Sequence, residues 1–142
     1  MQVLCLYKRG ELLMNQRKSL KELNLLDKFL FDEAMDDPEN VKTMLDIILS
    51  QNTNLKHPPQ TEKEQRTSTD NRQIRLDVYA IDEDDVIYEV EAQKENTHNL
   101  PKRSRLYQGI IDSKLLSPGV VDFNLLNEIL IVMITPFDLF GY

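Results

Sequence analysis

Cysteine and histidine are scarce in this sequence of 142 residues, which contains Cys5, His57 and His98 as its complete set. A lone cysteine excludes an internal disulfide and is compatible with a reducing cytosol. Structural zinc is usually held by about four Cys or His ligands at short, regular spacings. Three widely separated candidates therefore exclude a zinc finger.

Long apolar stretches are also missing. A membrane-spanning helix needs roughly 18 consecutive apolar residues. The longest such run here, Ile129 to Ile134, has the length of a buried strand. The start of the chain is a poor signal peptide, because Lys8 and Arg9 interrupt it early. We expect a cytoplasmic protein without a membrane association.

Positive charge is the third shortage, since 17 Lys and Arg residues stand against 24 Asp and Glu residues, giving a net charge of −7. This balance argues against a generic nucleic-acid binder, whose affinity depends on cationic side chains that meet phosphates. The charge is uneven, however: residues 77–95 contain eight acids and one base, whereas residues 96–114 contain four bases and one acid. An acidic site beside a basic strip suits metal ions beside a phosphate backbone. Two solvated surfaces would give the same pattern.

Length and apolar content, 41%, suit one globular domain with its own core. The chain ends just after an apolar run, so we expect residues 1–142 to be the N-terminal part of a longer protein.

The first 18 residues show no clear pattern. Apolar periodicity elsewhere predicts helices over 19–34, 38–51 and 102–116, a loop over 52–71, and strands over 74–81, 86–93 and 128–135. This order predicts an α/β fold with a mixed β-sheet flanked by helices.

The two strands around the acidic turn 82–85 carry unusual chemistry. Asp77 lies in the first, and Glu89, Glu91 and Gln93 share one face of the second, although acidic residues are poor strand formers. If Asp77 and Glu91 point to the same face, their carboxylates can share a hard cation such as Mg²⁺ or Mn²⁺, which prefers oxygen ligands. The main-chain carbonyl of Ala92 can be a further ligand. Gln93 can orient a water molecule but cannot take up its proton.

These residues resemble the PD-(D/E)XK nuclease superfamily, and more narrowly its transposase-like, recombination-promoting group in bacteria, in which Gln commonly replaces the lysine of the motif. The matching segments cover most of the chain from Asp27 onward. They are Asp27-Lys-Phe-Leu-Phe31, Arg75-Leu-Asp77-Val, Glu91-Ala-Gln93, Arg105-Leu-Tyr107-Gln108 and Ile134-Thr-Pro-Phe-Asp-Leu-Phe140-Gly. The sequence departs from the family pattern in having Leu76, not Pro, before Asp77.

The resemblance implies a single nuclease-like domain with a restriction-endonuclease-like core in α-β-β-β-α-β order. It also implies Mg²⁺-dependent hydrolysis of DNA, with a homodimer as one arrangement to consider. Asp77 and Glu91 would hold the metal, with Gln93 in the lysine position and Glu89 as a competing ligand. The resemblance further implies that Asp27 completes the site and that three residues of the following helix face the nucleic acid, namely Arg105, Tyr107 and Gln108.

Two other interpretations remain open. A catalytically inactive relative would keep the nuclease fold as a binding or assembly module, with clustered carboxylates but no cleavage. A protein-interaction domain would use its acids only for solubility. In that third case Asp77 and Glu91 would point to opposite faces of the sheet or lie far apart.

Overall fold

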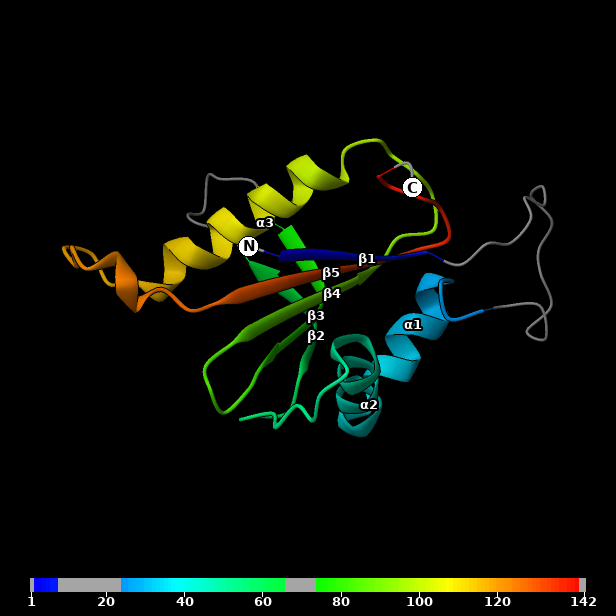
Figure 1. Cartoon of the computed structure of the whole chain (residues 1–142), viewed down its shortest axis with the longest axis horizontal. Coiled ribbons are helices and arrows are strands. Elements are labelled where there is room, and N and C mark those ends of the chain that lie inside the picture. The colour runs from blue at the N-terminus through cyan, green and yellow to red at the C-terminus, as the bar shows by residue number, and fades with distance from the viewer. Residues whose placement is uncertain (1, 8–23, 66–73, 141–142) are drawn as a thin grey trace.

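A five-stranded mixed sheet forms the centre of the protein (Figure 1). The computed structural model describes residues 2–7, 24–65 and 74–140, and for residues 2–7 and 65 it describes the backbone alone. The strands lie in the order β1-β5-β4-β3-β2. Strand β5 is parallel to both β1 and β4, whereas the β2–β3 and β3–β4 pairs are antiparallel. Their bounds are β1 Gln2–Tyr7, β2 Gln60–Gln65, β3 Ile74–Ile81, β4 Ile87–Ala92 and β5 Ile129–Thr135.

Helices cover both faces of this sheet (Figure 1). Helices α1 (Lys28–Met35) and α2 (Pro38–Leu49) pack on one face, and α3 (Leu100–Leu115) packs on the other. A short 3₁₀ turn, η2 (Phe123–Leu125), lies between α3 and β5. The predicted α/β class with a mixed sheet flanked by helices is therefore confirmed. No helix in the described parts of the chain is long and apolar enough to cross a bilayer.

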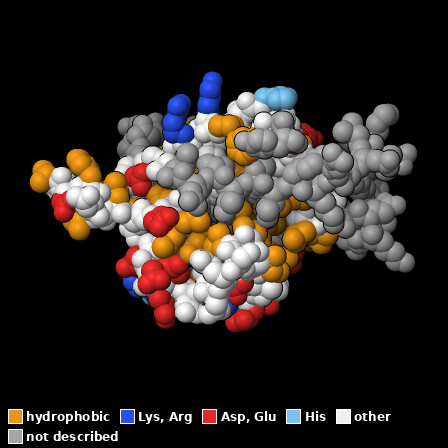
Figure 2. Space-filling view, in the orientation of Figure 1, with side chains coloured by type: hydrophobic (Ala, Val, Ile, Leu, Met, Phe, Trp, Pro, Cys, Tyr) orange, Lys and Arg blue, Asp and Glu red, His pale blue; other side chains and the backbone are white. Residues whose placement is uncertain are grey.

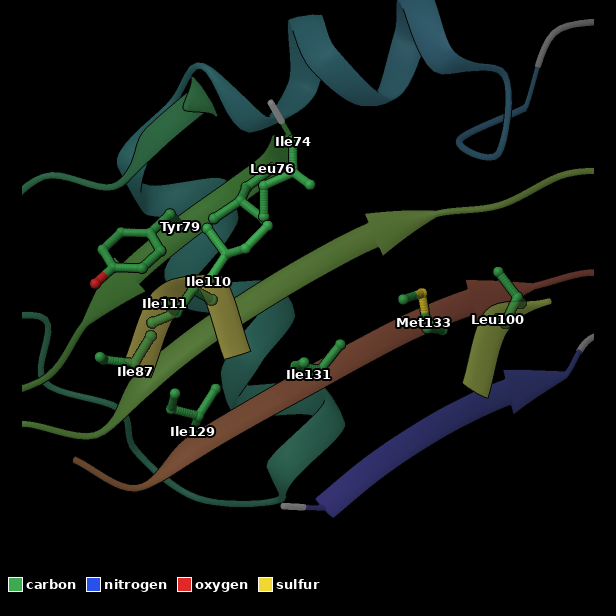
Figure 3. Close-up of a cluster of buried hydrophobic side chains, with 10 residues drawn as sticks. All are labelled: Ile74, Leu76, Tyr79, Ile87, Leu100, Ile110, Ile111, Ile129, Ile131 and Met133. Carbon is green, nitrogen blue, oxygen red and sulfur yellow. The ribbon is translucent and has the colours of Figure 1, made fainter. Parts of the chain in front are cut away.

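Two apolar cores separate the sheet from its helices. Phe31 and Leu45 bring α1 and α2 onto Val78, Tyr88 and other residues of the first core. Figure 3 shows the second core, in which α3 lies over the opposite face of the sheet. Its buried members are Ile74, Leu76, Tyr79, Ile87, Leu100, Ile110, Ile111, Ile129, Ile131 and Met133.

The start of α2 follows the sequence signals closely. Asp37 is the N-cap, its carboxylate accepts a hydrogen bond of 3.0 Å from the backbone N–H of Glu39, and Pro38 occupies the first turn. Helix α1 begins at Lys28, later than predicted. Residues 24–27, which we had expected to be helical, form turns, and residues 19–23 lie outside the described part of the chain.

The predicted alternation holds in β4 but breaks in β3. Ile74 and Leu76 face the α3 core, whereas Val78 and Ala80 face the α1–α2 core. The apolar side chains of β3 therefore change from one face of the sheet to the other at Asp77. The pairing of β3 with β4 ends at the same place, because the last pair at this end is Val78 with Val90. Beyond that pair the two strands separate, so Asp77 and Glu91 are not ladder partners.

The edge strands were the main errors in the sequence prediction. β2 lies within the segment that was predicted to be a loop. It was missed because its sequence, Gln-Thr-Glu-Lys-Glu-Gln, contains no apolar residue. The strand is held by backbone pairing with β3. Glu62 stands opposite Asp77 without pairing to it and has a left-handed backbone, with φ of 48°. β1 gave no pattern that we recognised. Within α3, Leu106 is 42% exposed, whereas Ile110 and Ile111 are buried.

The contrast between Leu45 and Ile47 on α2 tests the assignment of the α1–α2 core. Leu45 is fully buried, whereas Ile47 is 73% exposed. We expect Leu45→Ala to lower the free energy of unfolding by about 2–5 kcal/mol, because the truncated side chain leaves a cavity. Ile47→Ala should change it by less than about 0.5 kcal/mol. Urea unfolding measures both values, and equal losses would contradict the described orientation of α2.

Candidate functional site

A pocket of about 330 Å³ opens where β3 separates from β4. Four elements contribute to it, namely α1, β3, α3 and the end of β4 with the residue that follows. Its polar lining contains two carboxylates, one amide and three cationic side chains, and the remaining lining is apolar or aromatic. The lining residues are Lys28, Ile74, Arg75, Asp77, Glu91, Ala92, Gln93, Arg103, Leu106 and Tyr107.

Asp77 is held by a lysine from α1. Its side chain is 13% exposed, and its carboxylate accepts a hydrogen bond of 2.9 Å from Lys28 Nζ. The same ammonium donates to Asp32, one helical turn further along α1, also at 2.9 Å. Burial alone would lower the pKa of Lys28, but the hydrogen bonds to Asp77 and Asp32 outweigh it and raise the pKa. Lys28 is therefore a firmly charged member of the pocket.

Arg103 of α3 joins Glu91 to Gln93. Its Nη2 lies 2.5 Å from Glu91 Oε2 and 2.9 Å from Gln93 Oε1. Gln93 is fixed at its other end, since its Nε2 donates to the backbone carbonyl of Glu95 at 2.7 Å. Arg103 Nε is buried and has no hydrogen-bond partner among the described residues. The arginine thus sets the position of both polar groups at the end of β4.

Burial raises the pKa of Glu91, the Arg103 guanidinium opposes that rise, and the charge of Asp77 adds to it. Tyr107 lies one helical turn after Arg103, and its ring centroid is 5.8 Å from the guanidinium carbon. A hydrogen bond involving the Tyr107 hydroxyl favours the ionised form of Glu91. Burial, followed by the negative charge of Glu91, raises the pKa of Tyr107. Tyr107 therefore acts as a neutral donor beside Glu91.

Glu89 lies behind the pocket, fully buried, and is not a lining residue. Its carboxyl group donates a hydrogen bond to Glu91, and no other hydrogen-bond partner is found for it among the described residues. Burial raises its pKa well above the ordinary value of 4.5, and the nearby charges of Glu91 and Asp77 raise it further. Burial thus favours the protonated form of Glu89, and the pocket that Glu91 lines does not include Glu89, its expected competitor for the metal.

The structure distributes the other predicted residues unevenly. Tyr107 lines the pocket, but Arg105 is exposed and, like Gln108, is not part of the lining. Gln108 instead forms a hydrogen bond with Asp112. Asp27 is also outside the lining, where it forms an ion pair with Lys94 and accepts a hydrogen bond of 2.9 Å from the backbone N–H of Asn24. Its expected part in completing the site stays a prediction.

The lining residues that the sequence analysis did not predict include the two cations that contact the carboxylates of the pocket, Arg103 and Lys28. Arg103 had a usable signal, because it follows the buried Leu100 by three residues and precedes Tyr107 by four, which places it on the inner side of α3. Lys28 had none, since it is 49 residues from Asp77 and only the folded chain brings them together.

The pocket contains oxygen donors of the kind that a small divalent cation prefers. Mg²⁺ commonly takes one or two protein carboxylates and keeps several water molecules, and the pocket offers Asp77 and Glu91 with the Gln93 amide beside them. Ala92 also lines it and lies beyond the end of the β3–β4 ladder. The described residues contain no cluster of three or more Asp, Glu, His or Cys that could hold a metal ion. A cation in this pocket would therefore have two carboxylate ligands and would keep water molecules as the others.

Replacing Arg103 should show how much its ion pair with Glu91 contributes to the stability of the folded protein. In Arg103→Met, Glu91 is left 4% exposed without its counter-ion. We expect the free energy of unfolding at pH 8 to fall by about 3 kcal/mol, the lower end for breaking a buried ion pair, because Arg103 is itself one quarter exposed. Arg105→Met, on the exposed side of the same helix, should change it by less than about 0.5 kcal/mol. Similar losses in urea unfolding would show that Arg103 does not stabilise Glu91.

The buried carboxyl of Glu89 predicts a specific pH dependence in metal-free buffer. A raised pKa means that the folded protein holds a proton that the unfolded chain releases above its ordinary pKa of 4.5. The contribution of Glu89 to the free energy of unfolding is fully present below pH 4.5 and is lost as the pH rises through the pKa of the folded state. Glu89→Gln removes the titration, so the stability of this variant relative to wild type should increase from pH 4.5 to 8. A constant difference in unfolding free energy over that range would refute the protonated state.

No family model, curated protein or solved structure matches this chain. The fold and the pocket are therefore interpreted from the chain's own geometry. Asp77 and Glu91 line the same pocket, which is not the arrangement expected of acids that only keep a surface soluble. The resemblance to PD-(D/E)XK nucleases remains a prediction carried by the quoted motifs.

Proposed function

We propose that this protein is a divalent-metal-dependent DNA endonuclease with a restriction-endonuclease-like core, related to the transposase-like group of PD-(D/E)XK proteins. The observation that carries the proposal is the meeting of Asp77, Glu91 and Gln93 in one pocket, at the point where two central strands separate. Glu91 follows Asp77 by 14 residues in the sequence, and Gln93 follows Glu91 by two. A solvent-exposed strand face gives no reason for them to line a common cavity.

In this proposal Asp77, Glu91 and the Ala92 carbonyl hold Mg²⁺ or Mn²⁺. Such an ion lowers the pKa of a bound water molecule and offsets the negative charge that develops on a phosphoryl group. Hydrolysis forms one P–O bond from water and breaks one to the leaving sugar oxygen, which takes up a proton. Gln93 orients the water, and the Arg103 contact fixes its side chain for that task.

The charge of the pocket supports a phosphate substrate despite the net charge of −7. Lys28, Arg75 and Arg103 line it against the carboxylates of Asp77 and Glu91. In the view of Figure 2, most of the acidic side chains gather toward the bottom of the molecule, where some Lys or Arg atoms are also seen, and further Lys or Arg side chains project from the top. Within the lining, three cationic side chains stand against two carboxylates, and this local balance favours an anion.

One observation favours the second candidate, a catalytically inactive nuclease-fold module that binds or assembles. Both carboxylates of the pocket already have a protein counter-ion, Lys28 for Asp77 and Arg103 for Glu91. A module that binds no metal needs such internal neutralisation. In this candidate the pocket keeps its shape and charge balance and performs no hydrolysis.

Nicking of supercoiled plasmid DNA separates the two candidates. We expect the wild type to nick DNA with Mg²⁺ or Mn²⁺ and to stop in EDTA. Asp77→Ala and Glu91→Gln should each lower the rate by at least about 100-fold, because each removes a ligand of the metal ion that stabilises the transition state. Asp122→Ala is a matched acidic control on an exposed turn and should retain the wild-type rate.

The controls also identify the failure of the proposal. A wild-type protein that binds DNA without nicking it under any of these conditions would support the inactive module. Equal nicking by wild type and Asp77→Ala would show that a contaminating nuclease causes the activity.

A further inference from the structure

Lys28 stands apart from the other cations of the pocket in how it is held. It comes from the first turn of α1, on the face of the sheet opposite α3, and reaches Asp77 at 2.9 Å. Arg103 is committed to Glu91 and Gln93. Arg75 is about half exposed and lies 3.4 Å from Glu62. Lys28 is therefore the lining cation that lies directly against Asp77, and a second carboxylate, Asp32, fixes it there.

An ammonium group has three N–H donors, and two of those of Lys28 are used by Asp77 and Asp32. No third acceptor is found for it within residues 24–65 and 74–140. Its side chain is 43% exposed, so the remaining donor has access to solvent and to a ligand in the pocket. Because Asp32 also binds the ammonium group, Lys28 stays at the pocket when the Asp77 carboxylate binds a metal ion instead.

We infer that Lys28 is the substrate-contacting cation of this site, with its free N–H donating to a non-bridging oxygen of the DNA phosphodiester, and that Asp32 is its positioning residue. This inference rests on the proposed nuclease function and deepens it. Gln93 carries no charge, so it cannot offset the negative charge that grows on the phosphate during hydrolysis. Lys28 supplies that charge from a different part of the chain.

Lys42 provides a closely matched control. It forms the same type of pair within a helix, with Asp46 at 2.5 Å and four residues away, and it also contacts Asn52. It lies on α2 and does not line the pocket. Removing Lys42 therefore deletes a lysine and an ion pair without touching the proposed site.

The first test is cleavage of plasmid DNA at saturating Mg²⁺. We expect Lys28→Met to lower kcat about 100-fold, a typical effect of losing one charge-stabilising donor. Lys28→Arg should recover at least about tenfold of that loss, and Lys42→Met should stay within about twofold of wild type. Asp32→Asn should give an intermediate loss. If Lys28→Met does not fold, Lys28→Gln, which keeps a donor without the charge, replaces it.

The second test measures affinity for a short DNA duplex in EDTA over a range of salt concentrations. Each lost phosphate contact makes the slope of log K against log salt shallower by about 0.9. Lys28→Met should show this change, and Lys42→Met should keep the wild-type slope.

The two tests separate the failure of each idea. If wild type nicks DNA and Lys28→Met keeps its kcat within about threefold, the Lys28 inference is overturned and the nuclease proposal stands. If wild type does not nick DNA, the nuclease proposal fails, and an unchanged salt slope in Lys28→Met overturns the phosphate contact as well. A wild type that neither nicks plasmid DNA nor binds the duplex overturns both.

Discussion

A buried carboxylate on a β-strand needs a counter-ion, and the structure of the site depends on how Arg103 meets that need. Glu91 is almost completely buried at the end of β4, and the guanidinium of Arg103 reaches it from α3. The same contact holds Gln93, so one side chain links the sheet, the helix and the amide of the pocket. Packing of Leu100 and Ile111 against the sheet keeps α3 at the distance this contact requires. The apolar core and the ionic contact therefore support one another.

Much of the fold could be predicted because its central elements alternate in the expected way. The periodicity of β4 and the cap of α2 are local properties, and both appear where the sequence places them. β2 could not be found in this way, because a wholly polar edge strand shows no apolar alternation. The change of face at Asp77 was also invisible, since alternation in the sequence continues through it while the strand pairing does not.

Some residues of the candidate site could likewise be predicted from local sequence patterns, and others could not. Asp77, Glu91 and Gln93 were visible because carboxylates are unusual in strands and because a hairpin brings its two arms together. Lys28 was not, because its role depends on how α1 is placed against the sheet, which no local pattern reports. Glu89 shows the opposite problem, as a strand acid that resembles a ligand in the sequence but lies behind the pocket as a buried group whose protonated form is favoured. Residue type predicts the chemistry of such a site, whereas burial decides which members take part.

The left-handed backbone at Glu62 has a consequence for how this sheet tolerates sequence change. Glu62 lies opposite Asp77, so the irregularity that separates β3 from β4 extends into the neighbouring edge strand. Residues other than glycine or asparagine carry a conformational cost of about 1 kcal/mol there, and β-branched side chains carry more. Position 62 should therefore drift toward glycine or asparagine among descendants of this sequence. Valine or isoleucine, otherwise favoured in strands, should be selected against at this one point of β2.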